Sequence, residues 1–153
     1  MKSFFLFLFI AVSSVYSHGQ ILQEDTETEF PGGMSAFYDF VINNIIYPKQ
    51  AHRNKISGIV FVEFYIDEQG KVNQDSVRIV PASEMRRVAG DELANEITSN
   101  RFLEREAIRV IKKSPAWIPG KESGRPVAQK IVFPVSFDKD LFKSPRKGKI
   151  RMA

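Results

Sequence analysis

Two stretches of the chain carry apolar side chains at helical spacing. In residues 34–43 the apolar positions recur every three or four residues, at Met34, Phe37, Phe40 and Val41, which predicts an amphipathic helix with one apolar stripe. Residues 103–113 repeat this spacing and place basic side chains in the last turn, where the helix dipole favours them. Both stretches are therefore predicted to be helices that bury one face.

Alternating patterns predict three strands. Residues 59–66 are largely apolar on both faces, so this strand is predicted to be central or covered on both sides. The sequence Asp67-Glu68-Gln69-Gly70 predicts a hairpin turn, and residues 72–80 are predicted to return as a more exposed outer strand. Residues 127–137 are predicted as the last strand. Because Pro134 within it has no N–H to donate, that strand is predicted to lie at an edge, or its pairing to stop there.

Shorter segments connect these elements. Residues 48–53 are predicted to form a short helix with Pro48 at its first position. Residues 81–100 contain two possible helical turns that are interrupted at Gly90. Trp117, the only tryptophan, is predicted to pack over the sheet as a lid on the core.

This order of elements predicts an α+β fold with two helices packed on a three-stranded antiparallel sheet. The length of 153 residues suits one domain of ordinary size, and 43% hydrophobic residues, including 13 Phe, suffice for a core.

The N-terminus has the layout of a secretory signal peptide. Lys2 precedes an apolar run over residues 4–12, and Ser17-His18-Gly19 supplies small residues for cleavage after residue 19. As a helix the apolar core spans about 20 Å, short of the roughly 30 Å hydrocarbon layer of a membrane. No charge interrupts residues 3–23, so an uncleaved membrane anchor remains the alternative.

The rest of the chain divides into three parts. Residues 20–29 are polar and acidic and are predicted to form a flexible leader, and residues 30–138 are predicted to be the folded domain. Residues 139–153 carry six Lys and Arg side chains and are predicted to be a basic, disordered tail. Much of the formal net charge of +4 lies in that tail, so it does not argue for binding to nucleic acid.

The chain offers little catalytic or metal-binding chemistry. It has no cysteine, which excludes disulfides, thiol nucleophiles and cysteine–zinc sites. His52 is the only histidine after the predicted cleavage site, and it lies beside Arg53 rather than other ligands. We therefore predict no catalytic residues, no metal site and no cofactor, and expect a binding module rather than an enzyme.

Seven short motifs occur in order between residues 30 and 137. They are Phe30-Pro-Gly-Gly33, Tyr47-Pro48-x-x-Ala51, Gly58-Ile-Val-Phe-Val62, Asp67-Glu-Gln-Gly-Lys-Val72, Glu106-Ala107-Ile-Arg-Val-Ile111, Pro115-x-Trp117-x-Pro119-Gly120 and Phe133-Pro134-Val-Ser-Phe137. The ordered set resembles the C-terminal domain of TonB-type energy transducers, in the form common among Bacteroidetes.

The resemblance implies a partner and a binding mode. Domains of this family bind the TonB box, a short extended segment of an outer-membrane receptor, which adds a strand to their sheet. In the family the last strand offers the edge, which corresponds here to Gln129, Lys130, Ile131, Val132 and Phe133. The segment before Tyr47-Pro48 also lies near the partner in this family, which implies Asn44 and Ile45 as further contacts.

Two features depart from a full transducer. Only about ten residues, at most ~35 Å of extended chain, separate the predicted signal peptide from the domain, whereas a transducer has an anchor and a long spacer. Residues 83–101 also form a longer link into the second main helix than is usual, either an added helix or a binding loop.

These features define the functional expectation. We expect a periplasmic domain that binds a receptor peptide in TonB-dependent transport or its regulation. The alternatives are an anchored form facing the periplasm with inner-membrane motor partners, and a cell-envelope module that binds peptidoglycan or another envelope protein. A homodimer that pairs through the same edge is a further alternative.

Overall fold

The computed structural model describes residues 24–138. The predicted signal peptide at 1–19, the start of the leader and the predicted tail at 139–153 lie outside the described residues. The helices of the described part are α1 (Gly33–Asn44), α2 (Lys49–Arg53), α3 (Ala82–Glu96) and α4 (Arg101–Lys112). The strands are β1 (Gly58–Ile66), β2 (Arg78–Val80), β3 (Gly120–Glu122), β4 (Arg125–Val127) and β5 (Gln129–Phe137).

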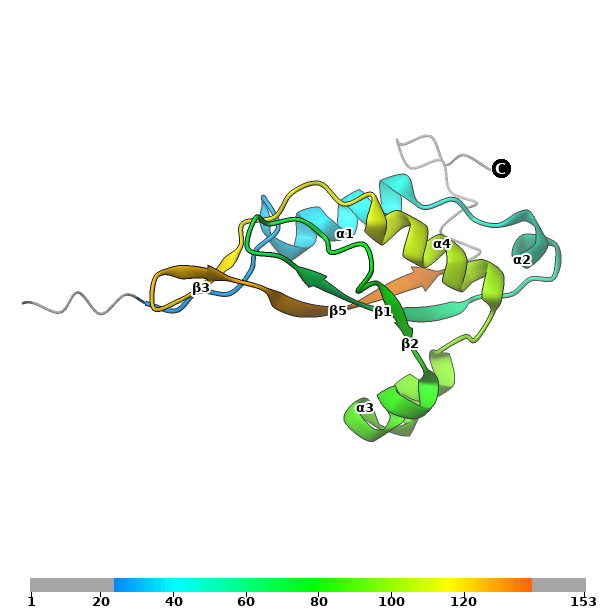
Figure 1. Cartoon of the computed structure of the whole chain (residues 1–153). Coiled ribbons are helices and arrows are strands. Elements are labelled where there is room, and N and C mark those ends of the chain that lie inside the picture. The colour runs from blue at the N-terminus through cyan, green and yellow to red at the C-terminus, as the bar shows by residue number, and fades with distance from the viewer. Residues whose placement is uncertain (1–23, 139–153) are drawn as a thin grey trace, which may run out of the picture.

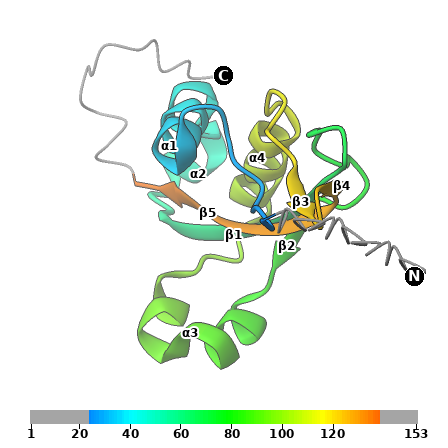
Figure 2. The same ribbon diagram turned by 90° about the vertical axis from the view of Figure 1, so that its left-hand side faces the viewer.

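The central sheet has three antiparallel strands in the order β2-β1-β5 (Figure 1). Helices α1 and α4 cover one face of this sheet, with α1 on the β5 side and α4 nearer β2 (Figure 2). Helix α3 lies against the opposite face, and β3 and β4 form a separate hairpin. The predicted α+β architecture of two helices on a three-stranded antiparallel sheet is therefore confirmed.

Strand β1 is buried on both faces, as its apolar pattern predicts. Its even-numbered residues from Val60 to Ile66 are fully buried under α1 and α4. On the other face Phe61 and Glu63 are also buried, together with Val80 of β2 and Ala94 of α3. Helix α3 thus covers part of this face, whereas Tyr65 of β1 and Val132 of β5 on the same face are 40% and 41% exposed. The predicted break within this region is confirmed by the non-helical Gly90.

Helix α4 begins at a side-chain cap. The Asn100 side chain accepts hydrogen bonds from the backbone N–H groups of Phe102 and Leu103, which have no partner within the helix. The apolar face of α4, from Leu103 to Ile111, is buried in the core. The strong helical periodicity of this segment therefore predicts both its position and its buried face.

Trp117 closes the core, as predicted. Its ring packs edge-on against Phe30, Phe37 and Phe64, and its indole N–H donates to the Ser114 hydroxyl (2.8 Å). Its backbone N–H donates to the carbonyl of Gly70 in the β1–β2 turn (2.7 Å). The turn and the chain leading to β3 are therefore held in direct backbone contact.

Three boundaries differ from the prediction. The return strand predicted at 72–80 is wrong in extent, because only Arg78–Val80 pairs continuously and Val72 forms an isolated bridge with Ile66. Between them Asn73 and Ser76 make turn hydrogen bonds to neighbouring groups, which replace the ladder. The last strand begins at Gln129, because residues 120–127 form the β3–β4 hairpin. Pro48 is the N-cap of α2 rather than its first residue.

Part of the stretch predicted as a flexible leader is paired with the domain. Thr26 bridges Lys121 and Glu29 bridges Ile118, with backbone hydrogen bonds of 2.8–2.9 Å. Residues 26–29 therefore lie beside the β3–β4 hairpin and approach the start of β5 (Figure 1).

We predict that Gly70→Ala lowers the free energy of unfolding by about 3 kcal/mol, whereas Gly90→Ala costs about 1 kcal/mol. Both glycines have positive φ, +78° and +83°, but a Cβ at residue 70 would lie 2.1 Å from the Trp117 carbonyl oxygen, whereas nothing lies within 4 Å at residue 90. Urea unfolding of the two purified variants measures the difference. Equal losses would show that the close contact at Gly70 contributes nothing.

Candidate peptide-binding edge

Strand β5 is the outer strand of the sheet on the α1 side. It pairs with β1 over nine residues, from Gln129 opposite Ile66 to Phe137 opposite Gly58, and the described residues place no strand on its other side. In an antiparallel ladder, successive residues direct their N–H and C=O groups alternately to one neighbour and to the other. Half of the β5 backbone groups therefore point away from β1.

Hydrogen bonds made by β1 identify which half. The carbonyls of Ile59 and Tyr65 accept from Thr98 and Asn73, and the Tyr65 N–H donates to the Ser76 hydroxyl. These partners all lie on the β2 side of β1. The odd-numbered residues of β1 therefore face β2, and the even-numbered residues, from Val60 to Ile66, face β5.

The register between β1 and β5 then shows which β5 residues face β1 and which face outward. The even-numbered β1 residues lie opposite the odd-numbered β5 residues, such as Ile131 and Phe133. The residues that direct their backbone groups to the outer edge are therefore Lys130, Val132, Pro134 and Ser136. Pro134 fits this assignment, because its missing N–H is then absent from the outer edge and not from the ladder with β1.

The five predicted edge residues divide into two groups by the direction of their side chains. Ile131 and Phe133 point towards the helices, and Phe133 is buried against Phe37 of α1. Lys130 and Val132 point to the opposite face and are exposed. Only Lys130 and Val132 of this set offer both an outward N–H and an outward C=O.

Gln129 connects the edge to the leader. Its side-chain oxygen accepts from the Thr28 N–H (2.5 Å), and its side-chain nitrogen donates to the Thr26 carbonyl (3.4 Å). A hollow of about 290 Å³ lies between this part of the leader and residues 129–131. The leader therefore limits the outer edge at one end, and the missing donor of Pro134 interrupts it further along.

Asn44 and Ile45 lie at the end of α1. Ile45 is 4% exposed and belongs to the core, and the Asn44 side-chain amide donates to the Phe40 carbonyl (2.7 Å). Glu106 and Arg109 of α4 hold this segment, because Glu106 accepts from the Ile46 N–H (2.6 Å) and Arg109 donates to the Asn44 carbonyl (2.8 Å). The structure thus does not bring Ile45 to the surface with the β5 residues.

A charged network lies on the face of the sheet covered by α3. Glu63 is buried and accepts two hydrogen bonds from Arg78 (2.8 and 2.9 Å), and Lys130 lies 3.6 Å from the same carboxylate. Arg78 also donates to Glu84 of α3 (3.2 and 3.3 Å). The hydrogen bond from Arg78 lowers the pKa of Glu84, and those from Glu84 and Glu63 raise the pKa of Arg78.

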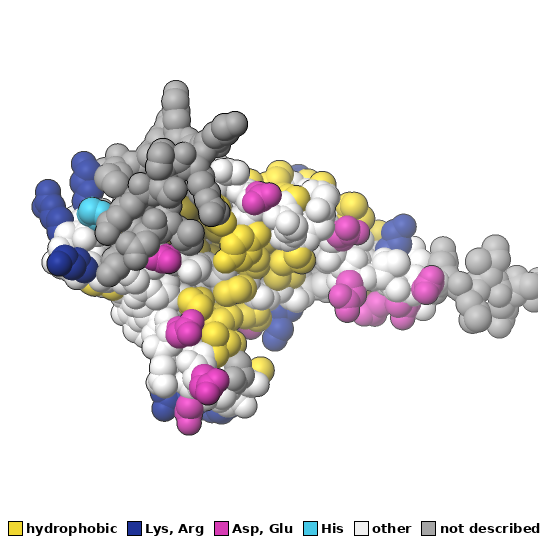
Figure 3. Space-filling model, turned by 180° about the vertical axis from the view of Figure 1, so that it is seen from behind, with side chains coloured by type: hydrophobic (Ala, Val, Ile, Leu, Met, Phe, Trp, Pro, Cys, Tyr) yellow, Lys and Arg dark blue, Asp and Glu magenta, His cyan; other side chains and the backbone are white. Residues whose placement is uncertain are grey.

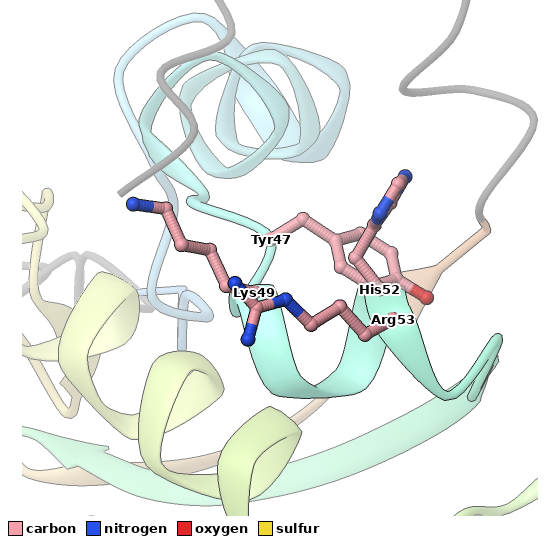
Figure 4. A pocket seen from close by; sticks show the side chains of 4 residues that line it. All are labelled: Tyr47, Lys49, His52 and Arg53. Carbon is pink, nitrogen blue, oxygen red and sulfur yellow. The ribbon is translucent and has the colours of Figure 1, made fainter.

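Two hollows lie near α2. The smaller, about 100 Å³, is lined by Tyr47, Lys49, His52 and Arg53, whose side chains surround the first turn of α2 (Figure 4). Ligand pockets usually have volumes of roughly 300–1,000 Å³, so this one is too small for an organic ligand. The larger, about 450 Å³, lies between α2 and α4 and is lined by Arg105 and Arg109 around the buried Glu106. Arg109 there is already bound to Glu106 (2.5 Å).

In the comparison with known families, the model of the C-terminal region of the Gram-negative bacterial TonB protein matches residues 43–89, which include α2, β1 and β2. This part of the chain is similar to the C-terminal domain of the TonB family. No curated protein matches the chain. Strand β5 lies outside the matched residues, and it joins them through its pairing with β1.

TonB C-terminal domains are interaction and transducer domains without enzymatic activity. As a family they act in the periplasm and interact with outer-membrane receptors. Among residues 24–138 there is no helix long and apolar enough to cross a membrane. In the same range no three His, Asp or Glu side chains gather closely enough to hold a metal ion.

Two features of this edge escape the sequence patterns. Pro134 and Ser136 also direct their backbone groups to the outer edge, but they were not among the predicted edge residues. The proline is a local signal for this direction, because a proline is tolerated where its missing N–H is not needed for the ladder. The contact of the leader with Gln129 has no local signal, because Thr28 and Gln129 are 101 residues apart.

We predict that the stability difference between the unmodified protein and Glu84→Gln shrinks as the pH falls below 4.5, the ordinary pKa of Glu84. A carboxyl whose pKa is lowered by folding stabilises the protein above its unfolded pKa, and this contribution is lost as the pH falls through the folded pKa. Urea unfolding at a series of pH values from 7 to 3 measures the difference. Glu92→Gln, an exposed change on the same helix, is the control; if its difference has the same pH dependence, the Arg78–Glu84 contact is not the cause.

Proposed function

We propose that this domain binds an extended peptide of an outer-membrane receptor, which adds to β5 as a fourth strand. The binding takes place in the periplasm and serves TonB-dependent transport or its regulation. The observation that carries the proposal is the outward direction of the backbone groups of Lys130, Val132, Pro134 and Ser136. In strand addition these groups supply the affinity, and pockets for alternate side chains supply the selectivity.

The edge is suited to a short ligand. The leader approaches β5 at Gln129, and the donor that a ladder would need at Pro134 is missing. An added strand would thus find outward acceptors at all four residues, and outward donors at Lys130, Val132 and Ser136 but not at Pro134. A partner segment of only a few residues is long enough to pair with this edge, and the chain on either side of that segment needs no contact with the domain.

We predict that Val132→Pro abolishes binding of receptor N-terminal peptides, whereas Val132→Thr leaves it within about threefold. Proline removes an outward N–H from the middle of the edge but no donor to β1, so the sheet tolerates it as it tolerates Pro134. Synthetic ten-residue peptides from the N-terminal segments of outer-membrane receptors are titrated by isothermal calorimetry. Circular dichroism establishes that both variants are folded.

Two results would contradict strand addition at β5. Unchanged peptide affinity in folded Val132→Pro would show that the outer edge is not the binding site. Binding that survives this change and falls steeply with added salt would instead point to a charged surface of an envelope module.

We predict that Pro134→Val tightens binding of the same peptides about three- to tenfold, because it restores one outward donor, and a hydrogen bond contributes roughly 0.5–1.5 kcal/mol. Pro126→Val in the β3–β4 hairpin is the matched control, since that proline belongs to a different sheet. Equal affinity in Pro134→Val and the unmodified protein would mean that the peptide does not reach this position.

A further inference from the structure

Three large apolar side chains of α1 are exposed in a row. Met34, Tyr38 and Ile42 are 50%, 41% and 44% exposed, and their spacing of four residues places them on one side of the helix. We call these three residues the α1 stripe. Met34 was predicted to share the buried face with Phe37 and Val41, but it lies beside that face. An apolar row of this kind, aligned along a helix, marks an interaction surface more often than a single exposed residue does.

The α1 stripe lies on the flank of α1 that faces the outer edge of β5. The Tyr38 ring packs edge-on against Phe133 of β5, with 5.7 Å between the ring centroids. Helix α1 also lies over the β5 side of the sheet (Figure 2). Seen from behind, the molecule shows hydrophobic side chains gathered into a band across this side (Figure 3). Val132, exposed on the opposite face of β5, places apolar surface on the other flank of the same edge.

The spacing of the α1 stripe matches the spacing of a strand. Four residues of helix rise about 6 Å, and two residues of strand rise about 6.6–6.8 Å. The helix and β5 also run in the same general direction, because Tyr38 contacts Phe133 and Tyr47, just after α1, contacts Phe137. In a strand added along β5, successive alternate side chains would therefore contact Met34, then Tyr38, then Ile42.

The backbone register determines which side chains these are. An added strand hydrogen-bonds to the even-numbered residues of β5, and its intervening residues lie beside Ile131, Phe133 and Val135. Side chains at these intervening positions point to the same face as Phe133, which is the face that α1 covers. The other half point towards Lys130 and Val132.

We propose that the α1 stripe selects the partner by binding the alternate side chains of the added strand. This inference rests on the proposed strand addition at β5 and specifies its ligand, an extended peptide with large apolar residues at every second position over about five residues. The occupant is a peptide strand because the α1 stripe continues the outer edge of β5, where the backbone groups of the even-numbered residues point outward and can pair with one. Charged side chains are disfavoured on the helix side, because the α1 stripe carries no charged group that could pair with them.

Two isosteric probe peptides test this selection. One is a ten-residue peptide of alternating valine and threonine, and the other is ten threonines; both have glycine-serine ends and a fluorescent label. Valine and threonine have the same shape and are both β-branched, so the probes differ mainly in apolar surface. The full-length protein is titrated with each probe by fluorescence anisotropy, and peptide contacts are mapped by NMR at millimolar concentration.

The test variant is Met34→Ser combined with Ile42→Ser, which leaves Tyr38 and its contact with Phe133 in place. The matched control is Val88→Ser, which removes an apolar side chain that is 79% exposed on α3. We expect the alternating probe to bind the unmodified protein at least about tenfold more tightly than the threonine probe. This preference should persist in Val88→Ser and fall to less than about threefold in the double variant.

The outcomes separate this inference from the proposed function. If both probes bind equally and Val132→Pro abolishes both, strand addition stands and selection by the α1 stripe is overturned. If neither probe binds, or binding is insensitive to Val132→Pro, both proposals fail. If the protein is a dimer that the double variant converts to monomers, and the probes do not bind, the occupant is a second copy of the chain and the inference is overturned.

Discussion

The close backbone contact between Gly70 and Trp117 is the constraint on which the arrangement of the domain depends. Only a residue without a Cβ fits beside the Trp117 carbonyl, and the hydrogen bond from Trp117 to Gly70 fixes the β1–β2 turn against the chain that leads to the β3–β4 hairpin. The next residue, Ile118, pairs with Glu29 of the leader. Three segments distant in sequence thus meet at one point, and β5 enters the sheet from there.

Strands β1 and β5 have different environments in the sheet. Strand β1 is buried on both faces in its middle, from Val60 to Phe64, and it has a neighbouring strand on each side. Strand β5 has the opposite character, because one face packs on α1 while its outer backbone groups and its other face are exposed. The buried Glu63 joins the two strands through Lys130 and extends through Arg78 to α3, so the outer face is organised by charge and the helix face by apolar packing.

Local sequence patterns predict those elements whose type and buried face are visible in the spacing of their own apolar residues. The two-sided apolar pattern of β1, the amphipathic spacing of α4 and the break at Gly90 are of this kind. Local patterns fail where a hydrogen-bond partner outside the pattern determines the conformation. Asn73 and Ser76 form a turn in place of a strand, because their side chains bond to nearby backbone groups. The leader is ordered by distant partners, Gln129 and Lys121. Periodicity also does not show that Met34 is exposed and Phe37 is buried. The apolar stripe of the helix is wider than the face that the sheet covers, so one side of the stripe stays in solvent. The five edge residues follow from family resemblance, but their division into outward and inward backbone groups requires the register.

Pro134 has a consequence for solubility. An uninterrupted sheet edge can template pairing with other copies, which can repeat from molecule to molecule and end in aggregation. With the donor at Pro134 missing and the start of β5 flanked by the leader, the edge lacks the long, regular row of groups that such growth requires. An edge interrupted in this way opposes growth from copy to copy, while the proposed partner strand needs only a short part of it.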